Sequence, residues 1–204
     1  IIIFSILNIL LLLVIILYGN KIFILDKPDS IRKHHKHPVP LAGGIIILIN
    51  ILSLLLFSQL SEFKELNYVF FNSRESIFSF YCGSCLVFLV GIYDDKYNIR
   101  PNIKLVLLFI IVLVVILIDS ELIINELYFS SLNFHTTLDN FSIFFTILCI
   151  LLFLNAINMF DGINMQVSIY ALSLFVILTL INNSVLFFIP IIICLFVVIF
   201  LNSN

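Results

Sequence analysis

Charged residues are scarce in this 204-residue chain, where Asp, Glu, Lys and Arg together make up 11%. An average soluble domain carries about a quarter charged residues. Disordered chains, coiled coils, disulfide scaffolds and nucleic-acid binders need more polar or charged residues than are present, so these classes are excluded. Hydrophobic residues make up 62% of the chain and its mean hydropathy is +1.24. The composition therefore predicts an integral membrane protein.

Glycine is also scarce, with six residues against 22 phenylalanines, so the helices offer few contact motifs built from small residues. The four cysteines lie inside apolar runs. Cys82 and Cys85 have the spacing of a redox motif, but no alternation of strands and helices surrounds them. We interpret the cysteines as small buried apolar residues.

Seven apolar runs are long enough for membrane helices, because a bilayer core about 30 Å thick needs about 20 apolar residues per helix. They are residues 1–18, 41–60, 77–93, 103–118, 141–159, 167–181 and 185–201. The predicted fold is an all-α, polytopic membrane bundle with about seven transmembrane helices in a single domain over residues 1–204. The sequence starts at Ile1 and ends at Asn204 directly after an apolar run, so we expect a piece of a longer protein.

The charges separate by membrane side. Loops 19–40, 94–102 and 160–166 fall on one side with the nearby span ends, and this side holds eight of the ten Lys and Arg residues and five acidic residues, a net charge of +3. The other side holds two basic and seven acidic residues, a net charge of −5. The bias in Lys and Arg predicts that the three loops are cytoplasmic.

The first of these loops is basic and rich in histidine. Its Lys and Arg residues would suit an anchor to anionic lipid headgroups, but such an anchor needs neither His nor the paired prolines 38 and 40. The alternative is an anion site for phosphates. The three histidines lack helical i, i+4 spacing, which argues against zinc. The basic residues are Lys27, Arg32, Lys33 and Lys36, and the histidines are His34, His35 and His37.

The second loop begins with two adjacent carboxylates, Asp94 and Asp95. Adjacent carboxylates at the end of an apolar helix repel each other and are costly to desolvate. One interpretation is solvation in the headgroup region beside Lys96. The other is a Mg²⁺ site, because Mg²⁺ takes one or two carboxylates and completes its coordination with phosphates and water.

The third loop follows a polar stripe. Helical steps of three place Asn155, Asn158 and Asp161 on one face. Such amides often only bond to neighbouring helices. The stripe nevertheless ends on the same membrane side as the carboxylate pair and the basic loop, so we favour one site shared by the three clusters.

The three clusters resemble, in order and spacing, the polyprenyl-phosphate N-acetylhexosamine-1-phosphate transferase family, glycosyltransferase family 4. The first cluster is more similar to the branch that serves O-antigen, enterobacterial common antigen and teichoic-acid linkage units than to the peptidoglycan branch. The matching elements are Asp26-Lys-Pro-Asp29, Arg32-Lys33-x-His35, Pro38-x-Pro40-x-x-Gly43-Gly44, Gly91-x-x-Asp94-Asp95 with Lys104, and Asn155-x-x-Asn158-x-x-Asp161-Gly162.

The resemblance implies a multi-pass enzyme of the inner (plasma) membrane that moves a sugar 1-phosphate from a UDP-N-acetylhexosamine or related UDP-sugar to polyprenyl (undecaprenyl) phosphate. UMP would be released, Mg²⁺ or Mn²⁺ would be the cofactor, and the site would face the cytoplasm. Membrane lipid is an expected partner and nucleic acid is not; a homodimer is compatible with the sequence.

The resemblance also implies roles for individual residues. Asp94 and Asp95 would hold the metal and acceptor phosphate, with Asp94 as a candidate base, and Lys104 would contact the lipid phosphate. Asp161 would act in catalysis and in nucleotide binding. The substrate-binding residues would be Asn155, Asn158, Asn164, Lys36, His35, Arg32 and Lys27.

Two departures limit the resemblance. Many relatives carry an acid and a glycine where this chain has Asn164 and Met165, and a neutral amide cannot anchor charge. The family's later Asp motif and His-rich loop would fall beyond Asn204, so we expect the 204-residue piece alone to be inactive. Competing interpretations are a catalytically inactive membrane fragment and an ion-coupled transporter, which would place charges near mid-span.

Overall fold

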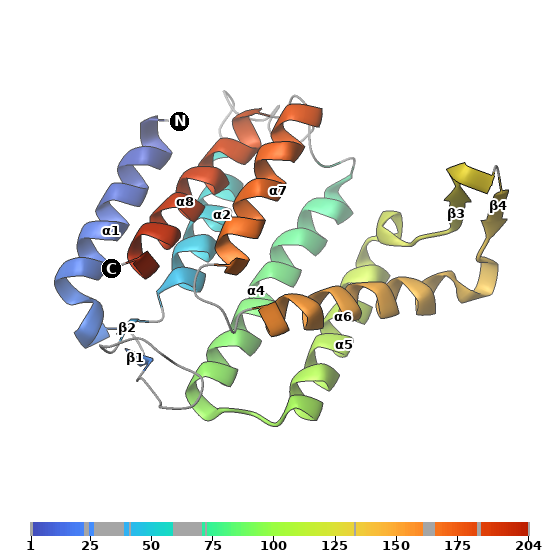
Figure 1. Cartoon of the computed structure of the whole chain (residues 1–204), viewed down its shortest axis with the longest axis horizontal. Coiled ribbons are helices and arrows are strands. Elements are labelled where there is room, and N and C mark those ends of the chain that lie inside the picture. Colours follow the sequence, from blue (N-terminus) through green and yellow to red (C-terminus); the bar gives the residue numbers. More distant parts are fainter. Residues whose placement is uncertain are drawn as a thin grey trace. The chain divides into compact units, whose positions relative to one another are not determined.

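The computed structural model describes residues 2–22, 25–26, 39–40, 42–58, 71, 73–132, 134–160, 166–182 and 185–203. Long helices coincide with all seven apolar runs, which confirms the all-α prediction (Figure 1). They are α1 (Ile2–Ile22), α2 (Gly43–Ser58), α4 (Arg74–Tyr97), α5 (Pro101–Ile118), α6 (Ser142–Phe160), α7 (Gln166–Asn182) and α8 (Val185–Ser203).

Four of the described helical segments are long and apolar enough to cross a membrane: Ile2–Gly19, Arg74–Tyr97, Pro101–Ile118 and Asp139–Asn158. Two shorter apolar helices are Gly43–Phe57 and Gln166–Ile181. Many large apolar side chains on these helices are exposed, as expected of surfaces that face lipid. The chain is an all-α membrane protein, and the number of spans stays a prediction.

Two compact units make up the chain. The first contains residues 1–72 and 159–204, and the second contains residues 73–158. The single domain over residues 1–204 stays a prediction.

In the first unit, α8 packs against α1, α2 and α7. A buried cluster joins α1, α2 and α8, and Cys194 is 1% exposed within it, which agrees with its interpretation as an apolar residue. The backbones of α2 and α8 approach closely, because a Cβ added at Gly43 would lie 3.3 Å from Cγ1 of Val198. The cluster consists of Ile15, Ala42, Ile46, Cys194 and Val198.

Two buried asparagines join α1 to α2. Asn8 donates to Oδ1 of Asn50 at 2.8 Å, and Asn50 donates to Oδ1 of Asn8 at 3.1 Å. Each amide also donates to the carbonyl four residues earlier in its own helix, Phe4 or Ile46. The two side chains are 0% and 1% exposed. Reciprocal bonding satisfies both amides, so the contact fixes how α1 meets α2.

Replacing one of these asparagines should destabilise the protein because the remaining amide loses its partner in an apolar environment. We expect Asn8→Leu and Asn50→Leu each to lower the free energy of unfolding in detergent by about 0.6–2 kcal/mol. The double variant should lose less than the sum of the two. Ser53→Ala is the control, since the Ser53 hydroxyl bonds the Asn50 carbonyl within one helix. Additive losses would contradict the pairing.

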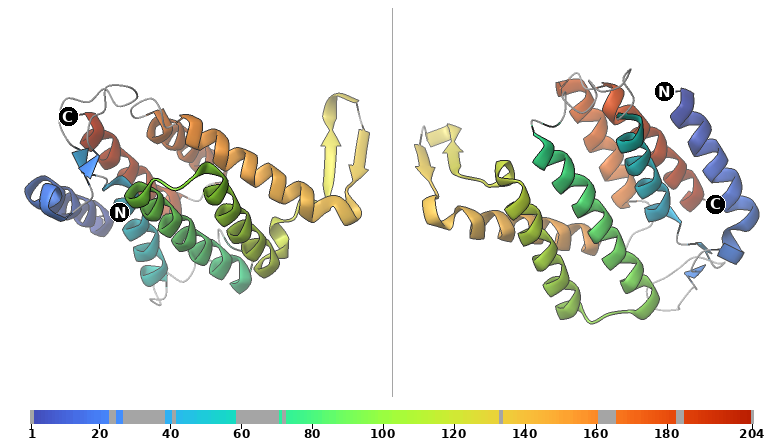
Figure 2. Two further views of the ribbon diagram at one scale, coloured as in Figure 1. Left: turned by 90° about the horizontal axis from the view of Figure 1, so that it is seen from below. Right: turned by 180° about the vertical axis from the view of Figure 1, so that it is seen from behind.

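In the second unit, α4 and α5 run antiparallel and side by side, as the views of Figure 2 show. A Cβ added at Gly83 would lie 2.9 Å from Cγ2 of Val115, so the glycine permits this approach. The glycine between Cys82 and Cys85 thus serves helix packing. A second cluster packs α6 against α5 through Val112, Ile116 and Ile147.

Gly83→Ala should therefore force α4 and α5 apart and lower the free energy of unfolding by about 1–3 kcal/mol. Gly91→Ala is the matched control on the same helix, because its added Cβ would meet nothing within 4 Å among the described residues. Combining Gly83→Ala with Val115→Ala should restore part of the loss. The free energy of unfolding would be measured by denaturant titration in detergent. Equal effects of Gly83→Ala and Gly91→Ala would contradict this packing.

Short elements that the sequence did not predict lie between α5 and α6. A β-hairpin pairs β3 (Glu126–Phe129) with β4 (Phe134–Thr137) in antiparallel register. Single turns of 3₁₀ helix precede, join and follow the strands: η2 (Ser120–Leu122), η3 (Ser130–Leu132) and η4 (Asp139–Phe141). This end of the unit also buries Asp119, which is 3% exposed and accepts bonds from the Ser79 hydroxyl and the Glu121 N–H.

Candidate functional site

The carboxylate pair lies on the last helical turn of α4. The helix runs to Tyr97 and is capped by Asn98, whose left-handed backbone (φ 47°) lets its N–H donate to the Asp94 carbonyl at 2.7 Å. Asn is one of the few residues that adopt this conformation readily. Pro101 then begins α5, and proline is favoured at the first position of a helix. Three residues, 98–100, thus link the two helices and hold their ends close together.

Lys104 joins the ends of three helices. From the first turn of α5, its Nζ donates to Oδ2 of Asp94 on α4 at 2.7 Å and to Oδ1 of Asn158 on α6 at 3.1 Å. The Lys104 and Asp94 side chains are 22% and 25% exposed. Lys104 and Asn158 are 54 residues apart in the sequence. The carboxylate pair and the amide stripe therefore meet at one end of the second unit.

The helix dipoles disfavour these charges where they stand. The C-terminal end of a helix carries partial negative charge and the N-terminal end partial positive charge. Asp94 and Asp95 are anions at the end of α4, and Lys104 is a cation at the start of α5. Partners of opposite charge offset this cost. The ion pair between Lys104 and Asp94 does so within the chain, and a bound cation at the carboxylates or a bound anion at the lysine would do the same.

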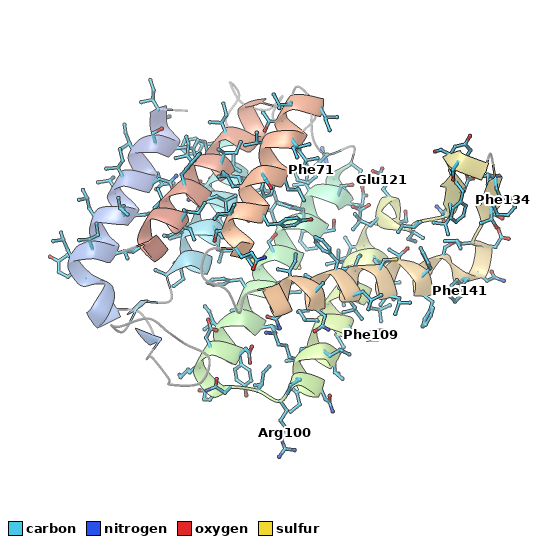
Figure 3. All side chains as sticks on the ribbon, viewed as in Figure 1. Phe71, Arg100, Phe109, Glu121, Phe134 and Phe141 are labelled. Atoms are coloured by element: carbon cyan, nitrogen blue, oxygen red, sulfur yellow. The ribbon has the colours of Figure 1, made fainter. Side chains whose placement is uncertain are left out.

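The two carboxylates have different surroundings. Asp94 faces Lys104, whereas Asp95 is exposed. Lys96, the basic residue next to the pair in the sequence, lies over the ring of Tyr97 with its Nζ 5.1 Å from the ring centre. Arg100 is exposed and extends away from the turn between α4 and α5 (Figure 3). The geometry thus singles out Asp94 as the carboxylate that works with Lys104.

The amide stripe on α6 is partly described. Asn155 and Asn158 are both exposed near the C-terminal end of α6, one turn apart. Asp161 and Asn164 lie outside the described residues. The shared face predicted for Asn155 and Asn158 is consistent with the bond from Lys104 to Asn158.

The basic loop lies in the first unit, and only its base is described. β1 (Leu25–Asp26) pairs antiparallel with β2 (Val39–Pro40), with Leu25 opposite Pro40 and Asp26 opposite Val39. This pairing brings the two ends of the loop together. Its predicted substrate-binding residues lie outside the described residues: Lys27, Arg32, His35 and Lys36.

A Mg²⁺ or Mn²⁺ ion fits the chemistry of the donors at the end of α4. Carboxylate oxygens are the ligands that these ions prefer, and Mg²⁺ is usually held by one or two carboxylates with phosphates and water. Among the described residues, no group of three or more His, Cys, Asp or Glu side chains is placed to hold a metal. Asp94 and Asp95 thus suit an ion that substrate phosphates help to hold, and not a closed structural site.

Sequence reasoning missed two polar contacts of the second unit. The contact between Lys104 and Asn158 depends on how α5 and α6 pack, which the spacing of residues along one helix does not show. Asp119 was counted only as a charge on the outer side, although it is buried against Ser79. A signal was present, since Ser76 and Ser79 form a polar face on α4 near the same end.

The ion pair can be tested by a double-mutant cycle. We expect Asp94→Asn and Lys104→Met to show a coupling free energy of about 0.2–1 kcal/mol, modest because both side chains are partly exposed. Lys96→Met is the matched control, since it removes the same charge near the same carboxylates. Its coupling with Asp94→Asn should be smaller. Equal couplings, measured by unfolding in detergent at low salt, would show that Lys104 has no special contact.

Comparisons with known proteins identify relatives of this chain. Residues 77–204 match glycosyl transferase family 4. The chain is 30% identical to the undecaprenyl-phosphate alpha-N-acetylglucosaminyl 1-phosphate transferase of Salmonella typhi over 143 residues. These residues are 70% of this chain and 35% of that protein. The chain is 28% identical over 151 residues to the protein of the same name from Escherichia coli strain K12, 72% of this chain and 36% of that protein. The match thus spans about a third of the length of these curated relatives. No solved structure matches the chain.

Proposed function

The chain belongs to glycosyl transferase family 4, and from this premise we propose that the full-length protein transfers an N-acetylhexosamine 1-phosphate from a UDP-sugar to polyprenyl phosphate. The products are UMP and a polyprenyl-diphospho-sugar that initiates a cell-envelope polysaccharide. The names of the curated relatives support undecaprenyl phosphate as the acceptor and an N-acetylglucosamine donor.

The observation that carries this proposal is the position of Lys104 between Asp94 and Asn158. Transfer between two phosphate compounds brings polyanions together, so the enzyme must mainly neutralise charge and position the groups. An ammonium group has three N–H donors. Two of those on Lys104 go to Asp94 and Asn158 among the described residues, and the third suits an oxygen of the acceptor phosphate.

In the proposed reaction, an oxygen of the acceptor phosphate attacks the phosphorus attached to the sugar. A new P–O bond forms, and the bond from this phosphorus to the oxygen shared with the uridine-linked phosphorus breaks, so UMP leaves with that oxygen. A phosphate monoester has a second pKa near 6 and is mostly dianionic at pH 7. The acceptor therefore needs no dedicated base, and Asp94 orients Lys104 in addition to its proposed role at the divalent ion.

Asp94 and Asp95 would hold the divalent ion, whose chemistry is to neutralise the charge of the diphosphate. Asn155 and Asn158 lie where amides can bond the nucleotide or the diphosphate. By resemblance, Asp161, Asn164, Lys27, Arg32, His35 and Lys36 complete the site; they lie outside the described residues. We propose the cytoplasmic face of the plasma membrane for this site because the flanking loops and the adjoining span ends hold eight of the ten Lys and Arg residues.

The transporter alternative gains no support. The Asp, Glu, Lys and Arg residues of the described helices all lie in a first or last turn, whereas an ion-coupled transporter places its ion site near mid-span.

For the full-length protein, we expect Asp94→Asn and Lys104→Met each to lower kcat for UMP release by 100-fold or more, because each removes a group that positions or neutralises phosphate. Release of UMP from UDP-N-acetylglucosamine and undecaprenyl phosphate is the measurement. Glu75→Gln is the matched control. Glu75→Gln also replaces a carboxylate by an amide, but Glu75 lies at the other end of α4, about 28 Å from Asp94 along the helix.

The control variant should keep its activity, and all variants should insert into membranes. Near-normal turnover of either site variant would remove that residue from the proposed site. A wild-type protein that inserts but releases no UMP from any UDP-sugar in a panel would support the inactive membrane protein instead.

A further inference from the structure

The β-hairpin between α5 and α6 has two chemically different faces. Residues directly opposite each other in an antiparallel pair point to the same side of the sheet. Phe129 lies opposite Phe134, and Leu127 lies opposite Thr136, so these four share one face. The other face carries Glu126, Tyr128, His135 and Thr137.

Side-chain contacts agree with this division. On the first face, the rings of Phe129 and Phe134 pack with their centres 6.1 Å apart. On the second face, Nε2 of His135 lies 3.3 Å from Oε2 of Glu126. We call the first the apolar face and the second the polar face.

The apolar face is open to its surroundings. Phe129 is 45% exposed and Phe134 is 54% exposed. A two-stranded hairpin is marginally stable by itself in water, and it usually needs a surface that covers its apolar side. Figures 1 and 2 show the hairpin set apart from the helices of its unit, joined to them only through the ends of α5 and α6.

The membrane surface is the covering that the position of the hairpin offers. Only residues 119–125 separate α5 from β3, and residues 138–141 separate β4 from α6, so the strands stay close to the ends of two membrane helices. Large apolar residues are also exposed at these ends: Leu122, Phe141 and Phe144 are 42%, 50% and 57% exposed. Phe and Leu are typical of the apolar faces of segments that lie at the boundary between lipid headgroups and acyl chains.

The charge of this segment defines the kind of lipid contact. Residues 119–141 contain four acidic residues and no Lys or Arg. Attraction to anionic headgroups is therefore absent, and an interaction with lipid must come from the apolar face.

We propose that the hairpin lies on the bilayer with Leu127, Phe129 and Phe134 inserted among the lipid headgroups. Its polar face then points to water. Zwitterionic lipid is sufficient for this contact, and salt does not weaken it. The hairpin thereby anchors the connection between α5 and α6 at the end of the unit remote from Lys104. This proposal is independent of the proposed reaction, since it concerns the other end of α5.

Single tryptophans can test the orientation, because the chain contains none of its own. We would make F129W and F134W on the apolar face and Y128W on the polar face as the matched aromatic control. Each chain would be reconstituted in phosphatidylcholine vesicles carrying nitroxide-labelled lipid. Aqueous iodide would be the second quencher.

We expect F129W and F134W to be quenched at least twofold more than Y128W by a nitroxide near the headgroup, and less than Y128W by iodide. A nitroxide at the bilayer centre should quench all three weakly. The difference should persist at high salt and at all protein-to-lipid ratios.

Three results would overturn the proposal. Equal lipid quenching of the three variants would mean that neither face prefers the bilayer, whether or not the hairpin is folded. Protection of F129W and F134W from both quenchers would mean that protein covers the apolar face. Quenching that falls as the protein-to-lipid ratio rises would identify a second copy as the covering surface.

Discussion

The contact of Lys104 with Asp94 and Asn158 governs the arrangement of the second unit's candidate site. One ammonium group brings together the end of α4, the start of α5 and the end of α6. This contact offsets part of the cost of placing these charges at unfavourable ends of the helix dipoles, and it requires the three helix ends to lie within reach of one another. The short turn capped by Asn98 sets the distance between α4 and α5, and the packing of α6 on Val112 and Ile116 brings Asn158 to the same place.

Polar side chains and glycines elsewhere specify how the apolar helices meet. Lipid is as apolar as leucine, so the hydrophobic effect does not select one helix face over another inside a membrane. In the first unit, the reciprocal bonds of Asn8 and Asn50 supply that selection. In the second unit, Gly83 sets the approach of α4 to α5, and the bond from Ser79 to the buried Asp119 ties the same two helices at their other end.

The sequence predicted the helices well because a membrane helix needs a long apolar run, and such a run remains recognisable when it contains a single polar residue. It also predicted which polar clusters share a membrane side, and the bond from Lys104 to Asn158 shows that two of them meet. It did not predict the asparagine pair, since the position of one Asn in an apolar run does not show which residue of another helix it bonds. The hairpin was missed because four-residue strands give too short an alternation of apolar and polar residues to stand out from a loop. The basic loop and Asp161 lie outside the described residues, so their part in the site stays a prediction.

The position of Lys104 at a helix end suits the acceptor that we propose. A polyprenyl phosphate is held in the bilayer by its chain, so its phosphate is confined to the headgroup region and cannot reach a site far above the membrane or deep within it. Groups that receive this phosphate must therefore lie at the ends of membrane helices. Lys104 is on the first turn of α5, and Asp94 is on the last turn of α4. On the proposed function, the charges that the helix dipoles disfavour at these positions would bind a phosphate and its counter-ion, whereas a structural role alone would favour the opposite signs.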